Sequence, residues 1–201
     1  MAISFQYNKT SMQRLKKELR VREKALPTLK NKEAALRAEV KKAKEVAEGL
    51  DKKLEEKLKA YQNATALWEE FDNELVTIED VELSVKKIAG VKTPVLEGIK
   101  FNIKDFSFFN KPAWYLDGIS IVKELAGIAI DREVYTQKMQ ILDYARKKTT
   151  QKVNLYEKVQ IPGYEEAILK IKRYLEDEEN LSKAAQKIVK SRILELEEES
   201  V

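Results

Sequence analysis

Residues 15–75 read LKKELRVREKALPTLKNKEAALRAEVKKAKEVAEGLDKKLEEKLKAYQNATALWEEFDNEL, and apolar residues recur along this stretch at alternating steps of four and three. From Leu15, fifteen of the eighteen positions reached are apolar, the exceptions being Arg22, Glu33 and Lys57. About eight would be expected by chance in a chain that is 43% apolar. A seam that repeats every 3.5 residues keeps one helix facing another along its whole length. At a rise of 1.5 Å per residue, the stretch predicts a rod about 90 Å long.

The first long helix is predicted over residues 9–85. Thr10 is followed three positions later by Gln13, which has the form of a capping box and places the helix start here. Pro27 conflicts with a regular helix, because proline lacks a backbone donor and crowds the preceding turn. The apolar rhythm continues through Pro27, so we expect a kink near residues 23–24, with a break into two helices as the alternative.

A small β-hairpin or loop element is predicted over residues 86–117. Within it, Ile99, Phe101 and Ile103 alternate with polar residues, which is the period of a strand. A two-stranded element alone in water is marginal, so its aromatic rings need a cover. They either pack onto the base of the coiled coil or dock onto another subunit. The aromatic candidates for an interface are Phe101, Phe106, Phe108 and Trp114.

The second long helix is predicted over residues 118–195, with Asp117 as its cap. Its apolar seam continues to Tyr156. The apolar stripe then restarts in a new phase at Tyr164, beyond Ile161-Pro162-Gly163. A Pro-Gly pair with a shift in phase indicates a bend or a local break in the helix.

The two helices are predicted to fold back on each other and run antiparallel. The predicted fold class is therefore all-α: a long antiparallel two-helix coiled coil with a small central β-hairpin or loop element. Folding about the middle of the chain would make the numbers of facing residues sum to about 203. Ala43 would then lie near Gln160.

The composition argues against an enzyme of the usual kinds. The chain has no His and no Cys, so the commonest general base, the commonest transition-metal ligand and the thiolate nucleophile are all missing. No Gly-rich phosphate loop occurs, and the carboxylates lie in helical runs. No apolar run reaches the roughly 20 residues needed to cross a bilayer. We therefore expect no catalytic residue, no cofactor, no metal and no direct membrane insertion.

The charge is unevenly distributed along the chain. Residues 9–59 contain 17 basic and 9 acidic residues, although the whole chain has a net charge of only +4. Such a stretch is either a solvated helix surface or a face for an acidic partner. Basic helical arms also bind RNA, but acidic residues are mixed among these lysines and few aromatics accompany them. A free-standing coiled-coil scaffold or tether and an RNA-binding arm are the two alternative functions.

Two sets of residues resemble the D subunit of V-type and A-type rotary ATPases, the central stalk of the motor. Leu15-Lys16-Lys17-Glu18-Leu19 and Leu29-Lys30-Asn31-Lys32 are similar to the family's L-K-x-x-L and L-K-x-K elements. Val153-Asn154-Leu155-Tyr156-Glu157 with Ile161-Pro162 is similar to its V-N-x-x-E-x-x-x-I-P signature. The second motif is the more specific, since many coiled coils could supply the first.

The resemblance implies a central-stalk rotor subunit that carries torque between ATP hydrolysis or synthesis in a catalytic head and proton or sodium movement in the membrane. The implied partners are the catalytic and regulatory head subunits, a small globular F subunit and a funnel-shaped subunit above the membrane ring. The implied location is cytoplasmic and peripheral to the membrane, with no bound nucleic acid. The remaining interface candidates are Lys16, Lys17, Lys24, Val153, Asn154, Glu157 and Pro162.

Overall fold

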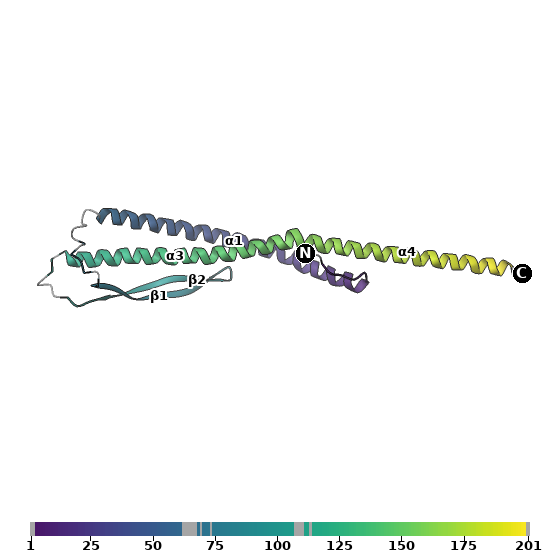
Figure 1. Ribbon diagram of the computed structural model, residues 1–201, viewed down its shortest axis with the longest axis horizontal. Coiled ribbons are helices and arrows are strands. Elements are labelled where there is room, and N and C mark those ends of the chain that lie inside the picture. The colour runs from purple at the N-terminus through teal and green to yellow at the C-terminus, as the bar shows by residue number, and fades with distance from the viewer. Residues whose placement is uncertain are drawn as a thin grey trace. The chain divides into compact units, whose positions relative to one another are not determined.

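A computed structural model describes residues 3–61, 68, 70–72, 74–106, 111–112 and 114–199, with side chains up to residue 194 (Figure 1). Its elements are α1 (Lys9–Tyr61), β1 (Val76–Ile88), β2 (Val91–Ile103), α3 (Tyr115–Leu155), the π-helical turn η3 (Tyr156–Gln160) and α4 (Ile161–Glu199). Two long helical stretches with a small antiparallel hairpin between them confirm the predicted fold class. The chain forms two units. The terminal unit is Met1–Asn31 with Thr150–Val201, and the central unit is Lys32–Thr149.

In the terminal unit, the start of α1 packs against α4. Leu15, Ala167 and Ile171 form the buried core of this unit. Half-buried apolar residues packed against that core are Ile3, Phe5, Met12, Tyr164, Ile168 and Leu175. Apolar residues of the two helices therefore bring them face to face, as the apolar seam in the sequence predicts.

The cap of α1 differs from the predicted one. Asn8 Oδ1 accepts a 2.6 Å hydrogen bond from the backbone N–H of Ser11, which makes Asn8 the capping residue. The Ser11 hydroxyl in turn accepts a 3.3 Å bond from the backbone N–H of Gln6. The capping box assigned to Thr10 was therefore wrong by two residues. Farther along, α1 continues through Pro27, so the break considered as an alternative is absent. The kink stays a prediction.

The π-helical turn explains the phase shift near Pro162. The backbone N–H of Ile161 donates to the carbonyl of Tyr156, five residues back instead of four. One extra residue per turn moves the apolar stripe by one position, so a seam due to continue at Gly163 continues at Tyr164. The wider turn also relieves the clash that a proline ring makes with the preceding turn. The predicted local break is absent, because α4 follows η3 directly.

The helices are antiparallel, but the predicted register was wrong. Facing residues have numbers that sum to between 181 and 187, not to about 203. The pairs are Arg22–Gln160, Lys30–Glu157, Asp51–Arg132 and Lys57–Glu124. Gln160 therefore contacts Arg22 rather than Ala43. The error of about three heptads has a simple cause: seams that repeat every seven residues match equally well after a slip by whole heptads.

The central unit contains the hairpin, where a second correction falls. The first helix was expected to run to residue 85, but α1 ends at Tyr61 and β1 begins at Val76. β1 and β2 pair antiparallel from Val76–Ile103 to Ile88–Val91. The turn uses Ala89 and Gly90 at φ values of 48° and 80°, the left-handed region that a tight hairpin turn requires.

The hairpin lies beside α3 within the central unit (Figure 1). Pro94, Val95 and Leu96 of β2 line a small cavity of about 60 Å³ together with residues of α3, among them Val134 and Tyr135. Packing against a helix supplies the cover that a two-stranded sheet needs.

Candidate partner-binding surfaces

An aromatic cluster closes the end of the central unit where α3 begins. Its buried members are Phe71, Leu75, Tyr115 and Ile119. The hydroxyl of Tyr115 donates a 2.6 Å hydrogen bond to the carbonyl of Glu70 and accepts a 3.1 Å bond from Lys111 Nζ. Tyr115 thus ties the start of α3 to the segment that precedes β1.

Two of the predicted aromatic interface residues belong to this cluster. Trp114 and Phe106 are half-buried and pack against its core. Phe101 lies in β2, with Lys123 Nζ 5.8 Å from its ring centroid. Phe108 lies outside the described residues. For Phe106 and Trp114 the structure shows packing within the chain, and docking onto another subunit stays a proposal for all four.

An apolar groove beside the cluster was not anticipated from the sequence. It has a volume of about 240 Å³ and is lined by Leu58 and Tyr61 of α1, Trp68, and Val122 and Leu125 of α3. Tyr61 and Trp68 were predicted to belong to one continuous apolar seam, so an opening of the seam near the end of α1 was not expected.

The basic interface candidates lie on the exposed side of α1. Lys16, Lys17 and Lys24 are all exposed, and none forms an ion pair within the described part of the chain. Arg22, which is on the same helix, instead points into the helix pair with an 18% exposed side chain. The three lysines therefore keep their charge available at the surface.

The second motif divides into packing and surface residues. Val153 is buried, whereas Asn154, Glu157 and Pro162 are exposed. Glu157 Oε1 accepts a hydrogen bond from Lys30 Nζ at 2.6 Å. Val153 thus acts through packing. An interface role for any of the four residues stays a proposal.

The end of α4 presents a long uncovered surface. Every residue from 176 to 194 is exposed. Large apolar residues are among them: Leu181, Ile188, Val189, Ile193 and Leu194. The residues that pack against the terminal core end with Leu175. The seven-residue spacing of Leu181 and Ile188 is a sequence signal for this stripe, and its exposure was not predicted.

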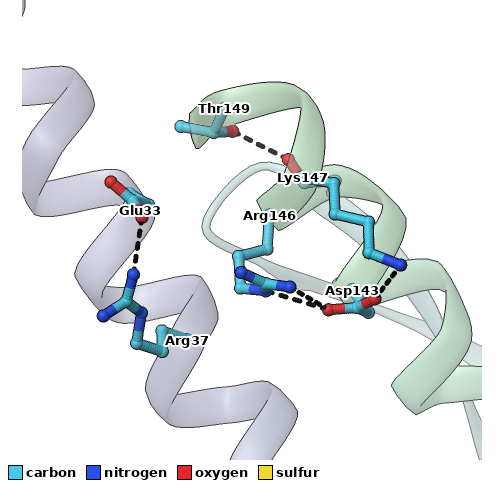
Figure 2. A network of polar contacts seen from close by, with 7 residues as sticks. Glu33, Arg37, Asp143, Arg146, Lys147 and Thr149 are labelled. Atoms are coloured by element: carbon cyan, nitrogen blue, oxygen red, sulfur yellow. Dashed lines mark hydrogen bonds and ion pairs between the residues drawn. The ribbon is translucent and has the colours of Figure 1, made fainter. Parts of the chain in front are cut away.

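Charge pairs shift several pKa values on the helix surfaces. Lys147 and then Arg146, through hydrogen bonds to the carboxylate, hold the pKa of Asp143 below its usual value (Figure 2). Arg22 lowers the pKa of Glu18 in the same way, and Glu124 raises the pKa of Lys57. All are salt-bridge effects at solvent-accessible positions rather than signs of a buried acid–base site.

Neither a metal site nor a membrane span is evident in the described residues. No group of three or more Asp and Glu side chains is placed to hold a metal ion there. None of the described helices is long and apolar enough to cross a bilayer.

Comparisons with known proteins agree over nearly the whole length. The model of the family described as the ATP synthase D subunit matches residues 11–191. The chain is 29% identical to the V-type ATP synthase D subunit of Chlamydia pneumoniae, over 96% of this chain and 95% of that protein. It is 30% identical to the V-type ATP synthase D subunit of Borreliella burgdorferi, over 92% of this chain and 93% of that protein.

Proposed function

The chain belongs to the ATP synthase D-subunit family, and from this premise we propose that it is the central-stalk rotor subunit of a V-type rotary ATPase. In this role it transmits torque between ATP hydrolysis or synthesis in the catalytic head and proton or sodium translocation in the membrane sector. It works at the cytoplasmic side, peripheral to the membrane, and does not hydrolyse ATP itself.

The observation that carries the proposal is the match to this family over residues 11–191, together with the uncovered end of α4. A helix in a protein gains most of its stability from packing its apolar face against a partner. Leu181 is 72% exposed and Ile188 57% exposed in the chain alone. Catalytic and regulatory head subunits that enclose this end would cover both side chains.

The charged and aromatic surfaces fit the remaining contacts. Lys16, Lys17 and Lys24 belong to the same unit as the uncovered end of α4, and we assign them to acidic loops of the head. Asn154, Glu157 and Pro162 are assigned to the same region, positioned by buried Val153. The small globular F subunit and the funnel-shaped subunit would bind the central unit. Phe101, Phe106, Phe108 and Trp114 are the candidate contacts there.

Affinity purification of the tagged chain from gently solubilised source cells tests the assignment to the complex. We expect stoichiometric recovery of two large head subunits and one small stalk subunit, identified by mass spectrometry. Recovery of the chain by itself, with RNA, or with unrelated filaments would contradict the proposal. Those outcomes would return the coiled-coil scaffold or the RNA-binding arm as the better interpretation.

A cysteine cross-link tests the rotor role within the assembled complex. The chain has no native Cys, so Lys187→Cys on α4 would supply its only thiol. A disulfide from this site to a cysteine placed in the head should stop ATP hydrolysis, and reduction should restore it. Hydrolysis that continues with the cross-link intact would rule out rotation of this subunit against the head. The reduced double-cysteine complex serves as the matched control.

A further inference from the structure

Arg22 occupies a place in the α1 seam that apolar residues fill elsewhere in the terminal unit. Its seam neighbours in the terminal unit are Leu19 and Leu26. The Arg22 side chain is only 18% exposed. A charged group in such a place destabilises the helix pair unless it finds hydrogen-bond partners.

The partners of Arg22 surround the π-helical turn. Its Nε donates a 2.7 Å hydrogen bond to Oε1 of Gln160, the last residue of η3. The guanidinium carbon lies 4.6 Å from the ring centroid of Tyr164 and 6.0 Å from that of Tyr156, the first residue of η3. Rings at these distances attract a cation through their π faces. Its Nη1 donates back along α1 to the backbone carbonyl and the carboxylate of Glu18.

These partners are lost one heptad farther toward the C-terminus. A slip of seven residues in that direction would place Arg22 opposite Ala167 instead of Gln160, with Ile171 in the place of Tyr164. Ala167 and Ile171 are apolar and only 3% and 0% exposed. Arg22 would then be held against apolar surface without a side-chain acceptor from the opposing helix. The apolar seam residues themselves would tolerate the same slip, because they repeat every seven residues.

We propose that Arg22 and the π-helical turn together specify the register of α1 against η3 and α4 in the terminal unit. A single polar residue in an apolar seam can select one register at some cost in stability. Arg22 is thus a positioning residue that disfavours the pairing slipped by one heptad toward the C-terminus. It does this because only one register brings it to Gln160 and Tyr164.

The register sets how far α4 extends beyond the start of α1. One heptad of slip would move that end by about 10 Å, at 1.5 Å per residue. This consequence rests on the proposed rotor function, in which the end of α4 meets the catalytic head. The register itself does not depend on that function and is tested separately.

The register can be tested on the full-length chain by measuring the distance between two spin labels with electron paramagnetic resonance. Spin labels at Gln13→Cys on α1 and Lys187→Cys on α4 occupy exposed positions, and no native Cys competes for the label. With Arg22 present we expect one distance. In Arg22→Leu the apolar seam becomes continuous, so the helices should stay folded and a second distance, shifted by about 10 Å, should appear.

Two further variants decide between a register role and a purely structural one. Arg22→Lys keeps a charge that still needs Gln160, so it should restore the single distance. Arg14→Leu removes an exposed arginine from the same helix and should leave the distance unchanged. If Arg22→Leu unfolds, Gln160→Leu removes the acceptor instead and should produce the same second distance. A single unchanged distance in a folded Arg22→Leu or Gln160→Leu chain would overturn the proposal.

The assembled complex then tests the functional consequence. Arg22→Leu should lower the number of ions pumped per ATP hydrolysed, whereas Arg22→Lys should preserve it. A mixed register with normal coupling would leave the register proposal standing and contradict only the consequence for the rotor. An intact register with failed assembly would have its cause elsewhere in the chain.

Discussion

Lys30 of α1 and Glu157 of η3 form an ion pair between the helices, with 2.6 Å between Nζ and Oε1. Each residue belongs to one of the two motifs by which the sequence resembles the rotor family. The two motifs therefore meet in the folded terminal unit. Lys30 lies about two turns along α1 from Arg22, and Glu157 belongs to the same π-helical turn as Gln160, so the ion pair adds a second polar link between α1 and η3.

This ion pair is expected to stabilise the protein only slightly. The Lys30 and Glu157 side chains are 48% and 45% exposed, so water and salt screen their attraction. A double-mutant cycle with Lys30→Ala and Glu157→Ala, measured by urea unfolding, should give a coupling of about 0.2–1 kcal/mol that falls as salt is added. A coupling well above this range that is insensitive to salt would show that the pair is more deeply enclosed than the structure indicates.

Two glycines of α3 should respond in opposite ways to alanine. A Cβ on Gly118 would lie 3.0 Å from both Phe71 Cε2 and Trp114 Cζ3, inside the packed aromatic cluster. Gly118→Ala should therefore lower the free energy of unfolding by about 1–3 kcal/mol. Gly127 has nothing within 4 Å of its added Cβ, so Gly127→Ala should raise it by about 0.5–1 kcal/mol. Equal effects measured by denaturant titration would contradict the close approach at Gly118.

Asp143 should contribute stability that disappears in acid. Lys147 and Arg146 lower its pKa in the folded state, with Lys147 Nζ 2.9 Å and Arg146 Nη2 2.7 Å from the carboxylate oxygens. A lowered pKa means that the contribution is present above the ordinary Asp value of about 3.9 and is lost as the pH falls through the folded-state value.

Asp143→Asn is the variant that checks this sign. It should be less stable than the parent at neutral pH, and the difference in melting temperature should vanish in strongly acidic buffer. A deficit that stays constant across the titration would point to a steric effect of the amide.

The helical part of the fold was predictable because its signal is repeated many times. The seam from Leu15 onward repeats the same seven-residue spacing over many turns. The same repetition concealed the register, which depends on single residues such as Arg22 and on the one extra residue of η3. The register is therefore set by local features of the helices that a periodic pattern does not contain.

The early start of the hairpin was missed for a related reason. Val76 and Ile78 alternate as strand residues, but the apolar positions then change parity to Val81 and Leu83. The pairing of β1 with β2 is shifted between Ile78 and Asp80, and such a bulge inserts a residue into the strand. The alternation of apolar and polar residues is therefore interrupted within β1, and this hid the strand in the sequence. The exposure of Lys16 and Lys24, by contrast, followed directly from their places between seam residues.

Reversing the charge of the basic candidates should weaken assembly of the complex. Lys16→Glu, Lys17→Glu and Lys24→Glu together would repel the acidic loops proposed for the head, most strongly at low ionic strength. The fraction of head subunits recovered with the tagged chain measures the effect. Lys86→Glu, Lys87→Glu and Lys92→Glu make the same change on the exposed hairpin and should leave head recovery intact. Unchanged head recovery with the first triple variant at low salt would refute the basic contact.

Substitutions in the uncovered stripe of α4 should affect assembly of the complex without affecting folding of the chain. Leu181 and Ile188 are exposed in the chain, so Leu181→Gln with Ile188→Gln should leave its unfolding transition nearly unchanged. In the assembled complex the same side chains would be enclosed by the head, and losing them should reduce head recovery and ATP-driven pumping together.

A control substitution in the terminal core should have the opposite effect, because it should destabilise the isolated chain itself. Ile171 is fully buried in the terminal core, and Ile171→Ala should lower the stability of the chain by about 2–5 kcal/mol. If the α4 double variant destabilised the isolated chain instead, the stripe would be covered by the chain itself. If it assembled and pumped normally, the end of α4 would not be the surface that the head encloses.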